Sequence, residues 1–504
     1  MSRSGAAALL SLALASGCAP GPAAPGGGTL TLAVRSDVTG VYPNPPIQSE
    51  AFTIDVASNV FEGLVRFDRS FKPQPALAVT WESPDERTWV FRLRRSARFS
   101  DGTPVVSADV VASIRAALTR GYVTAPFLSD LEEVATQGDD AVRIRTRHPS
   151  PVLLSHIPFG FVLPARALEQ RPVPPIGTGP YTVQRWEPGS ELVLARNPHY
   201  LDGPVPFERV RFVVTPSAAD RVAALRSGKA DVIDDLPTAE ADRLRSDPRV
   251  RVETRPGFRV LFLAFRMDRP PFSDPRVREA VDLAIDRAEL IERALPGRGV
   301  PASSLVPPSI VGFDAEVPPA RLDRERARGL LREAGFPHGL DVRLDGTRDR
   351  YANDAEVLAE AARQLATVGV RVEVNALPKS QFFPLLDGGG SDFYLLGWAC
   401  DTVHAGMALD ALMHSRSGGG LGSQNTQRLS DPELDRRIDA AREAAELSVR
   451  ARLLAGALAR VAELRPIVPL HVQVESIAFS RRLDWEPPLN LALRLHEVRL
   501  APPR

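Results

Sequence analysis

The chain has 504 residues, of which 44% are hydrophobic, and its 62 basic side chains are balanced by 62 acidic ones. A chain of this length exceeds one compact core, so we expect two or three domains. The balanced charge gives no general attraction to nucleic acid, which argues against a nucleic-acid-binding function.

The N-terminus has the layout of a secretory signal peptide. Arg3 is the only charge before an apolar run at 6–15, and small residues at 16–17 precede Cys18. Small residues directly before a cysteine resemble a bacterial lipobox, so we expect lipidation of Cys18 rather than simple cleavage. Residues 19–28, rich in proline, glycine and alanine, then predict a flexible tether behind a lipid anchor.

Cysteine usage predicts a fold without disulfides. The chain has two cysteines, so a lipidated Cys18 leaves Cys400 without a partner. We interpret Cys400 as a small buried hydrophobic residue rather than a nucleophile.

Patterns along the chain predict alternating strands and helices. Strands are expected at 29–34 and 88–94, and a helix at 107–118. A second helix begins at Pro275, capped by Asp274.

The same alternation continues toward the C-terminus. A strand at 340–344, a helix at 352–368 that Gly369 ends, and a strand at 370–374 follow one another. This order predicts a mixed α/β fold with predominantly parallel sheets and helices on their faces.

One long segment resembles a known family. Residues 75–114 read PALAVTWESPDERTWVFRLRRSARFSDGTPVVSADVVASI. They resemble the signature region of the extracytoplasmic solute-binding proteins of ABC importers, in family 5, which includes oligopeptide-, dipeptide- and nickel-binding proteins. Further blocks agree with that family in the same order, namely 177–181 with 186–189 and 196–200, 225–231, 271–287, and 430–435 with 467–470.

The resemblance implies a two-lobed periplasmic-binding-protein fold with a cleft between the lobes. Two strands, at 259–265 and 470–477, would cross between the lobes and form a hinge that closes on a ligand. The expected domains are a lipoprotein signal peptide at 1–18, a tether at 19–28, lobe I at 29–260 with an inserted subdomain at about 62–174, lobe II at 261–473, and a return to lobe I at 474–504.

The stretch 393–404 is the main candidate for the binding site. A short apolar run here predicts a buried strand that ends in Trp398, Asp401 and His404. The residues alone favour the ordinary interpretation, in which Asp401 is a turn or helix-capping residue and Trp398 is plain core. The family resemblance favours binding, because a Trp-x-x-Asp step occurs in peptide-binding members. It implies that Asp401 receives the α-ammonium group of a peptide and that Trp398 forms a cleft wall.

A second candidate, at Arg350 and Tyr351, would bind the opposite end of the peptide. Dipeptide-binding relatives carry an arginine and a tyrosine close together in this region, although here the two are adjacent. An ordinary solvated loop is an equally good interpretation. Because His404 lies near the expected cleft, a nickel complex or haem remains an alternative ligand. No histidines, however, stand at the spacing typical of metal ligands.

These features predict a receptor rather than an enzyme. The chain has no nucleophile-elbow, P-loop or dinucleotide-binding motif. We expect a lipid-anchored, monomeric substrate-binding component of an ABC importer in the bacterial envelope, with no cofactor and no metal, whose partners are a peptide and the permease subunits. The alternatives are a binding protein for nickel complexes or haem, and an envelope sensor or enzyme with the same fold.

Overall fold

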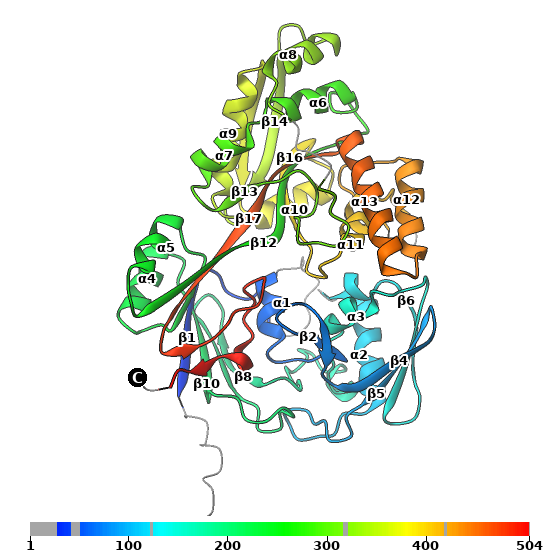
Figure 1. Cartoon of the computed structure of the whole chain (residues 1–504), viewed down its shortest axis with the longest axis vertical. Helices are drawn as coiled ribbons and strands as arrows, with labels where there is room; N and C mark the ends of the chain where they lie inside the picture. The colour runs from blue at the N-terminus through cyan, green and yellow to red at the C-terminus, as the bar shows by residue number, and fades with distance from the viewer. Residues whose placement is uncertain (1–27, 42–50, 121–123, 316–320, 418–420, 503–504) are drawn as a thin grey trace, which may run out of the picture.

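The computed structural model describes residues 28–41, 51–120, 124–315, 321–417 and 421–502. Cys18, the expected signal peptide and the tether up to residue 27 lie outside them. The described residues form two lobes, one above the other in Figure 1, which two long strands connect. None of the described helices is long and apolar enough to cross a membrane.

One sheet runs through both lobes. Its strand order is β15-β14-β16-β12-β17-β11-β1-β10-β9-β8, and β13 also pairs with β17. The bounds are β1 Thr29–Val34, β8 Tyr181–Glu187, β9 Glu191–Arg196, β10 Arg209–Val214, β11 Val232–Asp234, β12 Val250–Phe265, β13 Gly299–Pro301, β14 Leu340–Thr347, β15 Val370–Leu377, β16 Phe393–Ala399 and β17 Ile467–Ser480.

Strands β12 and β17 are the connection between the lobes. They pair antiparallel along most of their length and run side by side from one lobe to the other (Figure 1). In the lower lobe β17 pairs with β11 through residues 477–479, and in the upper lobe β12 pairs with β16 through 259–265. The lobes are therefore joined by a narrow two-stranded ribbon.

The expectation of predominantly parallel sheets is wrong. Parallel pairing in this sheet is limited to β1 with β10 and β11, and to β14 with β15 and β16. The chain crosses between the lobes upward in β12 and downward in β17, so these strands are antiparallel to each other, and β8 and β9 form a hairpin.

A smaller antiparallel sheet lies in the lower lobe. Its order is β4-β5-β7-β6, and α2 packs against β6 and β7. Its bounds, with those of two short ribbons, are β4 Ala78–Asp85, β5 Thr88–Leu93, β6 Leu131–Thr136, β7 Ala141–Thr146, β2 Val65–Phe67, β3 Pro73–Pro75, β18 Leu483–Asp484 and β19 Arg499–Leu500.

The helices cover the faces of the sheets. Their bounds are α1 Ala51–Ala57, α2 Ser107–Arg120, α3 Leu153–His156, α4 Ala218–Arg226, α5 Thr238–Arg245, α6 Pro275–Ala284, α7 Arg287–Ala294, α8 Arg324–Glu333, α9 Asp354–Ala366, α10 Lys379–Asp387, α11 Gly406–Ala408, α12 Pro432–Glu443 and α13 Leu447–Leu464. The predicted cap of α6 is confirmed, because the Asp274 carboxylate accepts a hydrogen bond of 2.9 Å from the Arg276 N–H.

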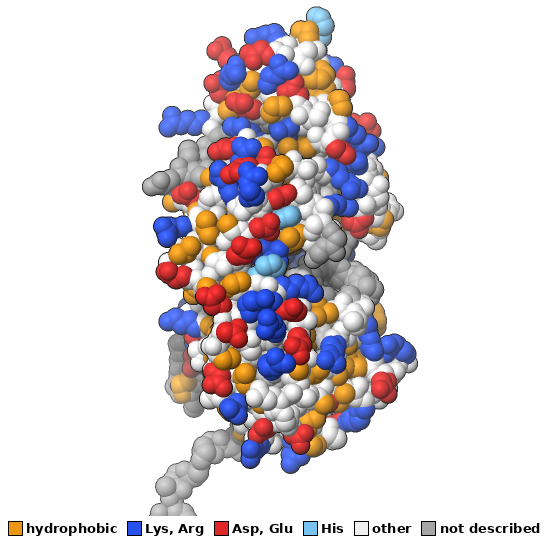
Figure 2. All heavy atoms as spheres, turned by 90° about the vertical axis from the view of Figure 1, so that its right-hand side faces the viewer, with side chains coloured by type: hydrophobic (Ala, Val, Ile, Leu, Met, Phe, Trp, Pro, Cys, Tyr) orange, Lys and Arg blue, Asp and Glu red, His pale blue; other side chains and the backbone are white. Residues whose placement is uncertain are grey.

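The upper lobe has a hydrophobic core on each face of its sheet. Along β12, Val260 and Phe262 enter one core, whereas Leu261 and Leu263 enter the other. Successive side chains of a strand point to opposite faces, so a strand covered on both faces reads as a continuous apolar run. Figure 2 shows basic and acidic side chains interspersed on the outer surface of the face that it displays.

Candidate functional site

A cavity of about 430 Å³ lies between the lobes, beside the ribbon of β12 and β17. Its lining comes from both lobes and from the ribbon. The contributing segments are α1 with the chain after it, the 158–161 loop, the 349–352 loop, the turn after β16, the middle of β17, and the C-terminal segment 490–496.

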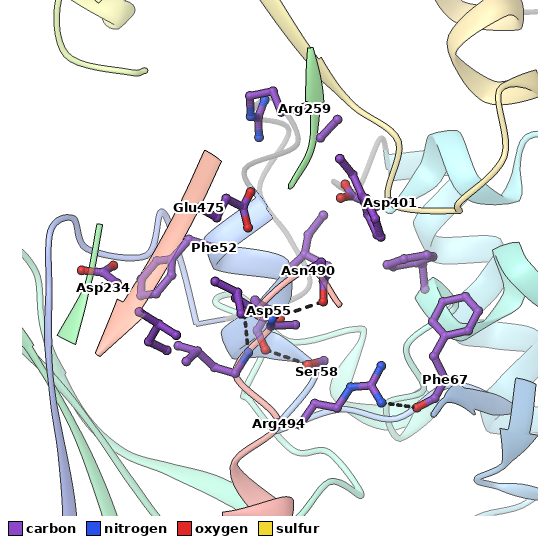
Figure 3. A pocket seen from close by; sticks show the side chains of 18 of the residues that line it. Phe52, Asp55, Ser58, Phe67, Asp234, Arg259, Asp401, Glu475, Asn490 and Arg494 are labelled. Atoms are coloured by element: carbon purple, nitrogen blue, oxygen red, sulfur yellow. Dashed lines mark hydrogen bonds between the residues drawn. The ribbon is translucent and has the colours of Figure 1, made fainter. Parts of the chain in front are cut away.

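One wall of the cavity is aromatic. It is formed by Phe67, Phe71, Phe159 and Phe258. Phe61 and Phe161 also line the cavity, and so does Phe52, on the side opposite Phe67 (Figure 3). The rings of Phe67 and Phe71 lie 5.4 Å apart, and the ring of Phe71 lies 5.1 Å from that of Phe258 on β12. This wall offers a ligand apolar surface that contacts both the lower lobe and the ribbon.

Of the acidic residues that line the cavity, three enter it from the two lobes and the ribbon between them. Asp55 comes from α1, Glu475 from β17, and Asp401 from the turn after β16 (Figure 3). The Asp55 carboxylate accepts a hydrogen bond of 2.7 Å from the Leu493 N–H. Within the described part of the chain, none of the three carboxylates forms a salt bridge, and Asp401 and Glu475 accept no hydrogen bond from a protein donor.

The surroundings of these carboxylates shift their acidity. Burial raises the pKa of Asp55 and of Glu475 to about 7, and repulsion by the Asp401 carboxylate adds to both shifts. Burial also raises the pKa of Asp401, against the attraction of the Arg259 guanidinium. The carboxylates are therefore held in surroundings that favour a ligand cation.

Basic side chains line the upper part of the cavity. The Arg350 guanidinium carbon lies 4.8 Å from the ring centre of Phe383 and 5.5 Å from that of Tyr351. The Arg259 guanidinium lies 5.8 Å from the Tyr351 ring centre. Lys379 lines the same region. These groups are placed to receive the negative end of a ligand.

The structure brings three of the predicted site residues together. Asp401, Arg350 and Tyr351 all line the cavity. Tyr351 is only 3% exposed, and its hydroxyl accepts a hydrogen bond of 3.0 Å from the Gly397 N–H on β16. That bond connects the 349–352 loop to the strand that carries Asp401.

The other two predicted residues lie away from the cavity lining. Trp398 packs in the core of the upper lobe, where it stands opposite Val260 of β12. His404 is 4% exposed, and its Nδ1 accepts a hydrogen bond of 3.1 Å from the Gly406 N–H. Cys400 is buried and free, in agreement with its interpretation as a small hydrophobic residue.

Asp55, Arg259 and Glu475 were missed by the sequence analysis. Glu475 had one usable signal, because it is a charged residue inside a strand whose other residues are largely apolar. Asp55 had none, since an acidic residue in a short helix is ordinary. No group of three or more His, Cys, Asp or Glu side chains in the described residues is placed to hold a metal ion.

Comparison with known proteins gives a consistent result. The model of the bacterial extracellular solute-binding proteins, family 5 Middle, matches residues 72–420. The glutathione-binding protein GsiB of Escherichia coli (strain K12) is 26% identical over 470 residues, which cover 90% of this chain and 91% of GsiB.

Two solved structures share the fold. The periplasmic binding protein DppA of Helicobacter pylori, in complex with the peptide STSA, superposes with a TM-score of 0.84 at 21% identity, covering 94% of this chain and 98% of that one. NikA of Staphylococcus aureus, in complex with Ni(L-His)2, gives a TM-score of 0.80 at 18% identity, covering 94% and 100%.

Proposed function

Since the chain belongs to the bacterial extracellular solute-binding proteins of family 5, we propose that it is the substrate-binding component of an ABC importer and that its substrate is a peptide. Asp401 carries this proposal, because its carboxylate faces the interlobe cavity without a salt-bridge partner among the described residues. The peptide-type ligands named for GsiB and for the DppA complex support it.

A peptide fits the distribution of charge in the cavity. Its α-ammonium group binds Asp401, and a charge-assisted hydrogen bond of this kind contributes about 1.5–3 kcal/mol. Its carboxylate end binds Arg350, and its side chains contact the aromatic wall. A metal complex is less well matched, because His496 is the one histidine of the described residues that lines the cavity.

The arrangement of the lobes supports binding by hinge closure. We propose a lobe I of residues 29–260 and 474–504 with the inserted subdomain at about 62–174, and a lobe II of residues 261–473. The ligand contacts both lobes only when they are closed, so binding shifts the population toward the closed state. The closed protein then delivers the peptide to the permease.

A contact between the lobes, remote from the ribbon, gives a prediction about closure. The Arg442 guanidinium on α12 lies 3.2 Å from His148 Nδ1 and 3.5 Å from the Asp130 carboxylate in the lower lobe. Since this contact requires closed lobes, Arg442→Leu is expected to weaken peptide affinity by roughly fivefold, the equivalent of about 1 kcal/mol. Calorimetry would measure the peptide affinity of this variant. Arg436→Leu, on the exposed face of the same helix, is the control. Equal losses in both variants would contradict the role of Arg442.

The proposed ligand class can be tested by thermal-shift measurements. Dipeptides, longer peptides, glutathione, nickel with histidine, and haem would each be added to the purified chain. A ligand that binds only the native state adds about 2.7 kcal/mol at a hundredfold excess over its Kd, so we expect a clear rise in Tm with peptides. A rise with nickel or haem alone would overturn the peptide proposal.

The N-terminal sequence supports a proposal about the location of the protein. We propose that lipidation of Cys18 anchors the monomeric protein to the bacterial envelope, with residues 19–28 as a tether. Acyl chains contribute about 0.8 kcal/mol for each buried CH₂, so several chains make the anchor effectively permanent.

A further inference from the structure

Asp55, Asp401 and Glu475 line the cavity with few cations close to them. Arg259 on β12 attracts both Asp401 and Glu475. Arg494 faces Asp55, but its guanidinium already donates a hydrogen bond of 2.7 Å to the Phe67 carbonyl and lies 3.7 Å from the Glu497 carboxylate. Arg259 is thus the one cation that attracts both Asp401 and Glu475, and none of the three carboxylates has a salt-bridge partner among the described residues.

The Glu475 carboxylate lies apart from the Asp401 carboxylate in the cavity. The two carboxylates enter the cavity from opposite sides, and Asp55 lies below them (Figure 3). The Glu475 side chain lies over Gly257, where a Cβ atom would come within 2.7 Å of its Oε1. Glycine at 257 therefore leaves the room that this side chain occupies.

A bound metal ion does not explain why these three carboxylates line one cavity. Asp55, Asp401 and Glu475 are not among any group of described residues close enough to share one ion. A single ammonium group needs one well-placed carboxylate, and Asp401 supplies it. The remaining two carboxylates match a second cationic group that lies some distance from the first.

We propose that the cavity selects ligands with two separated cationic groups at the amino end, such as peptides that begin with lysine, arginine or ornithine. Asp401 binds the α-ammonium group, and Asp55 and Glu475 together bind the side-chain cation. This inference rests on the proposed peptide-binding function and specifies the class of peptide.

Binding of such a ligand is coupled to proton release. In the free protein Asp55 and Glu475 have pKa values of about 7, so each is partly protonated near neutral pH. A bound cation stabilises the ionised carboxylates and lowers their pKa values. Protons therefore leave on binding, and affinity for the dicationic ligand rises as the pH is raised from about 6 to about 8.

Calorimetry with matched peptides tests this specificity. Lys-Ala-Ala and norleucine-Ala-Ala share the α-ammonium group, the carboxylate and a side chain of four carbons, and lysine adds a terminal ammonium group. With the full chain we expect the lysine peptide to bind at least about tenfold more tightly. The ratio of the two affinities should increase between pH 6 and pH 8, whereas titration of the shared α-amino group affects both peptides alike.

Variants of the protein test which carboxylates cause the preference for the lysine peptide. The ratio should fall toward one in Glu475→Gln and in Asp55→Asn, which keep the shape of each side chain, and should stay unchanged in Glu373→Gln, an exposed carboxylate on β15. A ratio near one in the unmodified protein, or a ratio that both cavity variants leave unchanged, would overturn the inference. Equal binding of both peptides refutes this specificity alone, whereas binding of neither, in di-, tri- and tetrapeptide versions, also refutes the proposed function.

Discussion

Replacement of Asp401 by alanine is expected to lower the affinity for peptides with a free amino terminus by roughly a hundredfold. In the complex the carboxylate and the ammonium group are both removed from water, so loss of the carboxylate leaves a buried cation without a partner. No other described side chain in the upper lobe places a carboxylate at the end of β16. Isothermal calorimetry of the purified variant measures the loss.

The same substitution separates binding from folding. Burial raises the pKa of Asp401, which means that the ionised group is unfavourable in the free protein. Asp401→Ala should therefore keep or raise the Tm while it lowers the affinity for the peptide. Asp341→Asn, an exposed carboxylate on β14, is the matched control, and N-acetylated peptide should bind weakly to both proteins. Unchanged affinity of Asp401→Ala for the free peptide would refute the assignment.

The fold could be predicted from the sequence because short segments match one family, and they do so in the same order along the chain. Segments such as 75–114 and 271–287 match one family in sequence order, and the matching family model covers residues 72–420. The direction of strand pairing could not be predicted in the same way. The alternation of helices and strands is compatible with parallel sheets, and only the path of β12 and β17 between the lobes makes them antiparallel.

Within the stretch 393–404, strand geometry decides which side chains face the cavity. Side chains alternate along β16, so Trp398 points into the same core as Val260 and Phe262, and Gly397 faces Tyr351. Asp401 follows the end of the strand, where the chain turns and the alternation no longer applies. Periodicity alone could have placed Trp398 in the core, although the family resemblance favoured a cleft wall.

The other carboxylates of the cavity could not be found by reading the chain in order. Asp55 and Glu475 are more than 400 residues apart in sequence and meet only because β17 returns from the upper lobe beside α1. Neither lies in a recognised motif. A cavity between lobes combines residues from distant segments, and the family resemblance implied the cleft without naming the residues on its lower side.

The Gly177-Thr-Gly-Pro segment of the lower lobe packs against the chain that follows α1, and this contact gives a prediction about stability. The Gly179 N–H donates a hydrogen bond of 3.0 Å to the Val60 carbonyl, and the Tyr181 N–H donates one of 3.0 Å to the Asn59 carbonyl. A Cβ atom at Gly177 would lie 2.8 Å from the Val60 carbonyl carbon. This contact is with backbone, so no side chain can rotate to relieve it.

Gly177→Ala is therefore expected to destabilise the protein by about 3 kcal/mol or more, because the two backbone segments must separate and lose their hydrogen bonds. The cavity should be affected as well, since Phe61 and Pro180 on these segments line it. Gly456→Ala is the matched control. Gly456 lies within α13 with open space at its Cβ position, so alanine there should stabilise the protein by about 0.5–1 kcal/mol. Denaturant unfolding of both variants measures these changes, and a Gly177→Ala protein as stable as Gly456→Ala would show that the segments are not packed as described.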